Sequence, residues 1–112
     1  HEIEFKDVEF EQAAYGIIAL QTVLPLLLKA GLSADLIAEK LSINPRKLLG
    51  LPISTINVDE NANFTIYHPT KEWAYTAQTN ASKSNNSPLL GTTLTGKVQL
   101  VYNNNQFENY EQ

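Results

Sequence analysis

Apolar residues in the first half of the chain recur at the spacing of one helical face. Between residues 19 and 30 they are Leu20, Val23, Leu24, Leu27 and Leu28. This period of three to four predicts a helix over residues 19–30. Pro25 is expected to bend that helix, because proline lacks the backbone N–H and its ring clashes with the preceding turn. Gly31 is expected to end it, since glycine readily adopts the left-handed conformation that follows many helices.

Two shorter helices are predicted next. Ser33 is a suitable N-cap, and the apolar residues that follow it continue on one face through residue 41. Asn44 and Pro45 then predict the start of a separate helix, with Asn44 as its cap and Pro45 in the first turn, where no backbone donor is needed. Gly50 is expected to stop this third helix.

After Pro52 the apolar period changes from helical to two. Residues 64–67 alternate and predict a strand, which His68 and Pro69 are expected to end. Further predictions are a strand at 73–75, a polar loop at 78–88, a strand at 97–102, a turn at 103–105 and a returning strand from Gln106. The acidic residues 1–15 are expected to form a loop. Helices followed by strands are typical of an α+β fold or of a seam between two domains.

The composition of the chain excludes several kinds of partner and of functional site. The net charge is −4 and the pI is near 5.0, which argues against a nucleic-acid or anionic-membrane partner. The absence of cysteine excludes disulfides, thiolate zinc sites and a cysteine nucleophile. The longest apolar stretch, residues 17–30, is too short and too polar to span a bilayer. No basic-then-apolar order typical of a signal peptide occurs at the start. We therefore expect a soluble, cytoplasmic protein.

Several segments resemble motifs of the dihydroorotases, which are cyclic amidohydrolases. The run from Tyr15, YGIIALQTVLPLL, resembles the family's FGIxGLETALPLL. The run from Leu41, LSINPRKLLGL, resembles LSxNPAKILGL, and ANFTIYHP at 62–69 resembles ADLTIFDP. Trp73, SKSNNSP at 82–88 and residues 91–98 resemble the family's tryptophan, SKSxNSPF and GxxLxGxV. These segments occur in the family's order, so the chain resembles the C-terminal fragment of a dihydroorotase.

The resemblance implies a fold for the complete protein: a metal-dependent (β/α)8 barrel with a small β-sandwich built from both ends of the chain. Residues 1–50 would be the C-terminal helical part of the barrel, and residues 51–112 the C-terminal part of the sandwich. The composition break at Pro52 agrees with this division. The expected fold class is therefore an α+β fragment, with the last barrel helices followed by the C-terminal strands of the composite sandwich.

The resemblance also implies an activity, the reversible hydrolysis of dihydroorotate to carbamoyl aspartate in pyrimidine biosynthesis, with zinc in the parent enzyme. His1 resembles the last residue of the family's DxAPH, and its spacing to Tyr15 and Gly16 matches the family. The substrate-binding residues implied are His1, Tyr15 and Gly16. The family's metal ligands and catalytic aspartate lie upstream of His1. No catalytic residue, metal ligand, zinc or activity is therefore expected in this chain alone, because a catalytic zinc takes three or more protein ligands. His68 is expected to be a surface residue.

Three departures from the family pattern leave alternatives open. Ala19, Gln21 and Asn63 stand where the family has glycine, glutamate and aspartate. One alternative is a non-catalytic dihydroorotase-like scaffold that partners aspartate transcarbamoylase. Others are a hydantoinase or allantoinase relative, an unrelated small α+β domain, and a His1 left by a purification tag. The expected partners are the small-molecule substrate in the parent and a second copy of the chain, because the family's covering elements are missing.

Overall fold

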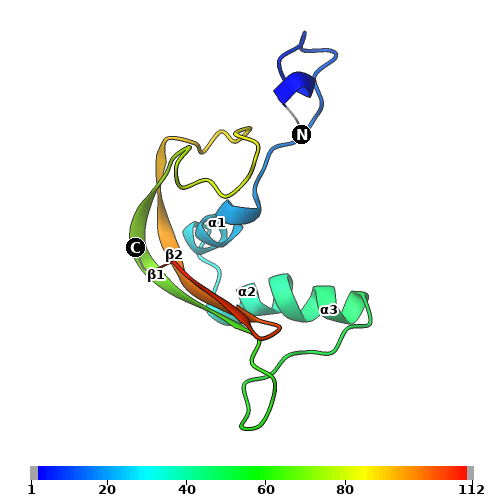
Figure 1. Ribbon diagram of the computed structural model, residues 1–112, viewed down its shortest axis with the longest axis vertical. Coiled ribbons are helices and arrows are strands. Elements are labelled where there is room, and N and C mark those ends of the chain that lie inside the picture. The colour runs from blue at the N-terminus through cyan, green and yellow to red at the C-terminus, as the bar shows by residue number, and fades with distance from the viewer. Residues whose placement is uncertain (1–2, 111–112) are drawn as a thin grey trace.

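The computed structural model describes residues 3–110 (Figure 1). A 3-10 turn at Ile3–Phe5 begins an otherwise irregular N-terminal arm, which confirms the prediction of a loop for the described part of residues 1–15. The helical elements are η2 (Leu20–Thr22), α1 (Val23–Lys29), α2 (Ala34–Ala38), η3 (Glu39–Ile43) and α3 (Asn44–Leu48). The strands are β1 (Phe64–Tyr75), β2 (Thr92–Asn103) and β3 (Gln106–Asn109). Helices precede strands, as the α+β prediction requires.

The helix predicted over residues 19–30 is present as η2 followed by α1. Pro25 is the third residue of α1, so it lies in the first turn, where it interrupts no α-helical hydrogen bond. The bend expected in mid-helix is therefore not required, because the 3-10 turn η2 takes up the change in geometry before the α-helix begins. Gly31 ends the helix as predicted: its φ is 81°, and its N–H donates to the Leu28 carbonyl at 2.9 Å.

The helix predicted to begin at Asn44 and Pro45 is present as α3, but the predicted break before it, with Asn44 as a cap, is wrong. Ser33 caps α2 as expected, since its Oγ accepts from the Leu36 N–H at 3.3 Å. The chain then stays helical through the π-helical turn η3 into α3, and Asn44 has helical backbone angles of −66° and −43°. Pro45 cannot donate to the carbonyl four residues earlier, and the wider π turn accommodates this missing bond. Gly50, with a φ of 66°, follows the end of α3 as predicted.

The prediction that His68 and Pro69 end a strand is also wrong. The alternating segment at 64–67 and the segment at 73–75 are two parts of one twelve-residue strand, β1. Its pairing with β2 passes from His68↔Lys97 to Glu72↔Thr95, so residues 69–71 form a bulge opposite Gly96. A proline is tolerated in a strand where no ladder donor is needed, and a bulge supplies such a position.

The C-terminal hairpin agrees with the sequence. β2 contains the predicted strand at 97–102 and begins earlier, at Thr92. Asn103 pairs with Gln106, so Asn104 and Asn105 form a two-residue turn in which both have a positive φ, 52° and 61°. Asparagine tolerates this left-handed conformation better than most residues. The resulting antiparallel sheet has the order β1-β2-β3.

The long strands β1 and β2 curve around α1, which lies against the concave side of the sheet (Figure 1). The buried apolar residues in the described chain are Ile37, Tyr75 and Leu94. This core is small, and the Cα radius of gyration of 16.4 Å exceeds the ~13 Å expected for a compact domain of this length. None of the helices within residues 3–110 is both long and apolar enough to cross a membrane.

Candidate functional site

Gly16 follows the N-terminal arm and leads into η2. Its φ is 102°, a conformation that glycine adopts at little cost and other residues rarely adopt. The Gly16 carbonyl accepts two hydrogen bonds, from Lys6 Nζ at 2.8 Å and from Asn86 Nδ2 at 2.7 Å. Lys6 Nζ also donates to the carbonyl of Ala14. Both acceptor positions of the Gly16 carbonyl are thus occupied by groups far from it in the sequence.

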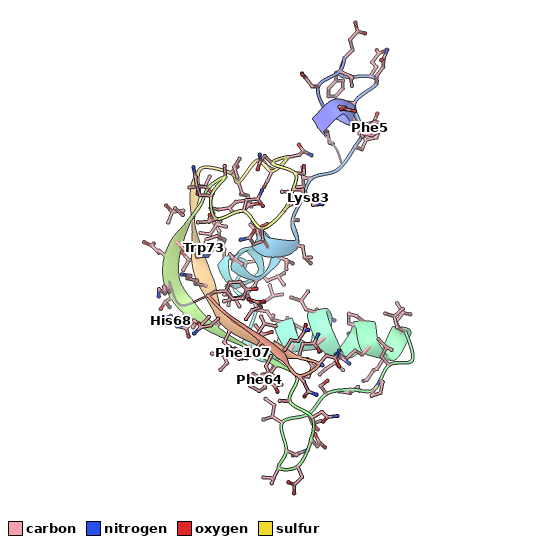
Figure 2. All side chains as sticks on the ribbon, in the orientation of Figure 1. Phe5, Phe64, His68, Trp73, Lys83 and Phe107 are labelled. Atoms are coloured by element: carbon pink, nitrogen blue, oxygen red, sulfur yellow. The ribbon has the colours of Figure 1, made fainter. Side chains whose placement is uncertain are left out.

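Asn86 holds this segment through its backbone as well as its side chain. The Asn86 carbonyl accepts from the Ile18 N–H at 3.0 Å. Asn86 belongs to the SKSNNSP segment, which lies in the loop between β1 and β2. In Figures 1 and 2 this loop, on which Lys83 is labelled, lies next to the chain that enters η2. Two segments that resemble separate family motifs therefore meet in space.

Gln21 makes a second connection between the same two segments. Its Nε2 donates to the Thr79 carbonyl at 2.7 Å, and its Oε1 accepts from the Ala81 N–H at 2.9 Å. The primary amide thus pairs with the loop backbone as another peptide group would. A glutamate here, as in the family pattern, would present an ionised carboxylate to the Thr79 carbonyl and could not donate to it.

The loop has its own internal support. The Asn80 Nδ2 donates to the Ser84 carbonyl at 2.8 Å and to Asn85 Oδ1 at 2.9 Å. Asn80 Oδ1 accepts from the Tyr75 hydroxyl at 3.1 Å, and Tyr75 is 1% exposed. A hydrogen-bonded network therefore connects the core of the sheet, through Asn80, to the part of the loop that binds the Gly16 segment.

The side chain of Tyr15 takes no part in this network and is 85% exposed. Among residues 3–110, no group hydrogen-bonds to the backbone of Tyr15 or to the N–H of Gly16. The arrangement therefore fixes the Gly16 carbonyl and leaves the N–H groups of Tyr15 and Gly16 and the Tyr15 phenol accessible. Such a loop can bind and orient a small polar ligand, but it contains no nucleophile or general base of its own.

The other predicted residues lie elsewhere. His1 is outside the described residues. His68 is exposed, as predicted, and its Nδ1 accepts from the Thr70 N–H at 3.3 Å on the side of the sheet away from Gly16 (Figure 2). No group of three or more potential metal ligands occurs among residues 3–110, so the residues described do not fit a zinc site.

Among residues 3–110, two carboxylates have clearly shifted pKa values, and both lie at the surface outside this site. The hydrogen bond from Lys40 lowers the pKa of Glu39, and a second bond from Asn44 adds to that effect. The hydroxyl of Thr55 lowers the pKa of Glu60 in the same way. Each shift comes from local hydrogen bonds to the ionised carboxylate and indicates no acid–base chemistry.

A hollow lies between α1 and β2, with Pro25, Leu28 and Pro69 among its lining residues. Its wall is mainly leucine, proline and threonine, and it includes neither Tyr15 nor Gly16. It is the gap between a helix and a curved sheet and shows no convergence of reactive groups.

Three residues that shape the Gly16 segment are not among the predicted site residues: Lys6, Gln21 and Asn86. In the sequence, Gln21 stands out only as a departure from the family, and Asn86 only as part of a motif. The available signal is that each supplies a side-chain amide within a motif segment. Sequence order alone could not show that these segments meet.

No protein-family model matches the chain, but several known dihydroorotases are similar to it in sequence. A dihydroorotase of Trichlorobacter lovleyi is 42% identical over 100 residues, which cover 86% of this chain and 24% of that protein. A dihydroorotase of Geotalea daltonii is 43% identical, with the same shares covered. A dihydroorotase of Aquifex aeolicus is 43% identical over 95 residues, 81% of this chain and 22% of that protein.

The chain thus spans about a quarter of the length of the curated relatives it matches. Identities of this size extend over most of the chain and include relatives from different organisms. They agree with the motif order found in the sequence. On this basis the chain belongs to the dihydroorotase family.

Proposed function

We propose that this chain is the C-terminal part of a dihydroorotase that interconverts dihydroorotate and carbamoyl aspartate in pyrimidine biosynthesis. In the hydrolytic direction water adds to the ring amide carbon, the C–N bond breaks, and the released nitrogen takes up a proton. The names of the relatives support this activity over that of a hydantoinase or allantoinase. No observation within residues 3–110 favours the scaffold alternative or association with aspartate transcarbamoylase.

The role proposed for this chain is to hold substrate. The observation that supports it is the Gly16 segment, in which the carbonyl is fixed by Lys6 and Asn86 while the Gly16 N–H and Tyr15 stay accessible. A backbone N–H directed at a carboxylate or carbonyl oxygen is an effective anchor, and a fixed loop loses little entropy on binding. His1, Tyr15 and Gly16 would then border the substrate.

The remaining proposals follow from the family. Residues 1–50 would be the closing helical part of a (β/α)8 barrel, and residues 51–112 the C-terminal part of the β-sandwich. Zinc would generate the hydroxide nucleophile. It would be held by residues of the complete protein beyond this chain, since residues 3–110 do not fit a metal site. The proposed location is the cytoplasm.

The test is a steady-state assay of the complete protein that contains this chain, supplied with zinc, in both reaction directions. Wild-type protein should convert dihydroorotate. Tyr15→Ala should raise KM several-fold, and His68→Ala, on the far side of the sheet, should leave KM unchanged. Absence of turnover by zinc-loaded wild-type protein would refute the proposed activity. Equal KM values for the two variants would refute the role of Tyr15.

A further inference from the structure

Asn86 bonds to the backbone on both sides of residue 17. Its side chain donates to the Gly16 carbonyl at 2.7 Å, and its own carbonyl accepts from the Ile18 N–H at 3.0 Å. These bonds close a ring across the peptide groups that flank residue 17. A single residue in the loop between β1 and β2 therefore fixes the direction in which the Gly16 carbonyl points.

The restraint by Asn86 matters because the restrained residue, Gly16, is a glycine. Glycine populates positive and negative φ about equally, so its φ of 102° is not enforced by its own sterics. Rotation at Gly16 would turn the Tyr15–Gly16 peptide and redirect its N–H. Lys6 also reaches the Gly16 carbonyl, but its ammonium is on a long flexible stem and can follow the carbonyl as it moves. The planar amide of Asn86 is attached to a short side chain and has less freedom to follow.

The loop that carries Asn86 is itself anchored. Asn80 bridges the loop to the buried Tyr75 hydroxyl, and Gln21 pairs with the backbone at Thr79 and Ala81. A support must be more rigid than the segment it positions, and these contacts provide that rigidity. Asn86 is half-buried as a residue, but its bond to the Gly16 carbonyl is exposed, so the restraint depends on the anchoring of the loop.

We infer that Asn86 is a positioning residue for substrate binding: it holds the Gly16 carbonyl toward the loop, so that the Gly16 N–H and Tyr15 face the substrate. Asn86 acts through the Gly16 segment and does not touch the substrate. The inference rests on the proposed function of Tyr15 and Gly16. By this inference, the polar SKSNNSP loop between β1 and β2 contributes to substrate binding by Tyr15 and Gly16.

The test compares Asn86→Ala with Ser87→Ala in the complete protein. Ser87 is the adjacent residue, and its Oγ accepts from the Leu89 N–H at 3.3 Å, outside both the Gly16 segment and the network of Asn80. Two measurements are made on each variant: amide hydrogen exchange of residues 15–19 by mass spectrometry, and kcat and KM for dihydroorotate. Asn86→Ala should speed exchange of residues 15–19 and raise KM about three- to tenfold with kcat within about twofold. Ser87→Ala should leave both close to wild type.

The outcomes separate this inference from the proposed activity. If zinc-loaded wild type does not turn over dihydroorotate while Asn86→Ala alone speeds exchange, the activity fails and the contact between Asn86 and Gly16 stands. The inference is overturned if exchange at 15–19 is unchanged in Asn86→Ala. It is equally overturned if exchange increases and KM does not, or if Ser87→Ala matches Asn86→Ala in both measurements. A fall in kcat with KM unchanged would also contradict it.

Discussion

Replacement of Gly96 by alanine should destabilise the contact between α1 and the sheet. Gly96 has a φ of 103°, and a Cβ built there would lie 2.5 Å from Leu28 Cδ1 and 3.7 Å from the Cα of Pro25. The positive φ alone costs a residue with a side chain about 1–2 kcal/mol. Crowding a methyl group into a packed site costs about 1–3 kcal/mol, and the low end applies here because the atom met is the end of the half-buried Leu28 side chain, which can shift. The free energy of unfolding of Gly96→Ala should therefore fall by about 2–3 kcal/mol.

Gly91→Ala is the matched control. Gly91 has a φ of 85°, but a Cβ at this position would meet nothing within 4 Å. It should therefore show the backbone cost without the steric one, about 1–2 kcal/mol. The difference between the two variants measures how closely α1 approaches the sheet. A double variant that adds Leu28→Ala to Gly96→Ala should recover part of the loss, because it removes the atom that a Cβ would meet.

The assay is urea unfolding of the 112-residue chain, followed by tryptophan fluorescence at two protein concentrations. Trp73 is the only tryptophan in the chain. Its Nε1 donates to the Gly96 carbonyl at 3.0 Å, so its emission reports on this contact. Equal destabilisation by Gly96→Ala and Gly91→Ala would refute the close approach of α1, and so would a double variant that behaves additively.

The remaining predictions concern charge, activity and assembly. Gln21→Glu should lower the melting temperature at pH 7, because the carboxylate cannot donate to the Thr79 carbonyl. Near pH 4 the carboxylate becomes protonated, so the melting temperature of the variant should approach that of wild type. An equal loss of melting temperature at both pH values would contradict this. The isolated chain should not turn over dihydroorotate and should not retain stoichiometric zinc by elemental analysis. Measured turnover or stoichiometric zinc would disprove the expectation. In the complete protein, His1→Ala should raise KM far more than His68→Ala does, whereas equal effects would exclude a substrate-binding role for His1. The isolated chain should self-associate at micromolar concentration in sedimentation, because Leu48, Leu49 and many other apolar side chains are exposed; a cooperative monomer would show that it closes its own core.

Local signals predicted the turns and helix ends most reliably. Gly31 and Gly50 both follow helices with a positive φ, and Ser33 caps α2. Asn104 and Asn105 form the hairpin turn that their residue type favours. In each case the structure depends on a few neighbouring residues whose conformational preferences are strong. Such features can be predicted from sequence because no distant contact has to be known.

The errors at Pro45 and Pro69 have a common cause. The sequence predicts a boundary at both prolines, because proline cannot donate a backbone hydrogen bond. The structure instead changes the local bonding pattern and continues: a π turn precedes Pro45 in the helix, and a bulge contains Pro69 in β1. At Pro69 this solution depends on Gly96 in the opposite strand, which packs against Leu28 of α1. A sequence read segment by segment has no access to that partner.

The same limit applies to the candidate site, and it explains why motifs alone described it incompletely. Tyr15 and Gly16 were predicted from their resemblance to a family segment, but their geometry is set by Asn86, seventy residues away in the chain. The contact requires β1 and β2 to pair in the observed register, which brings the loop between them back to η2. It also requires Asn80 and Tyr75 to hold that loop in shape. Because backbone carbonyls accept most of these bonds, the residues that receive them carry no signal in their side chains. The substrate segment can therefore be recognised from sequence, whereas the residues that orient it emerge only when helices and strands are placed together.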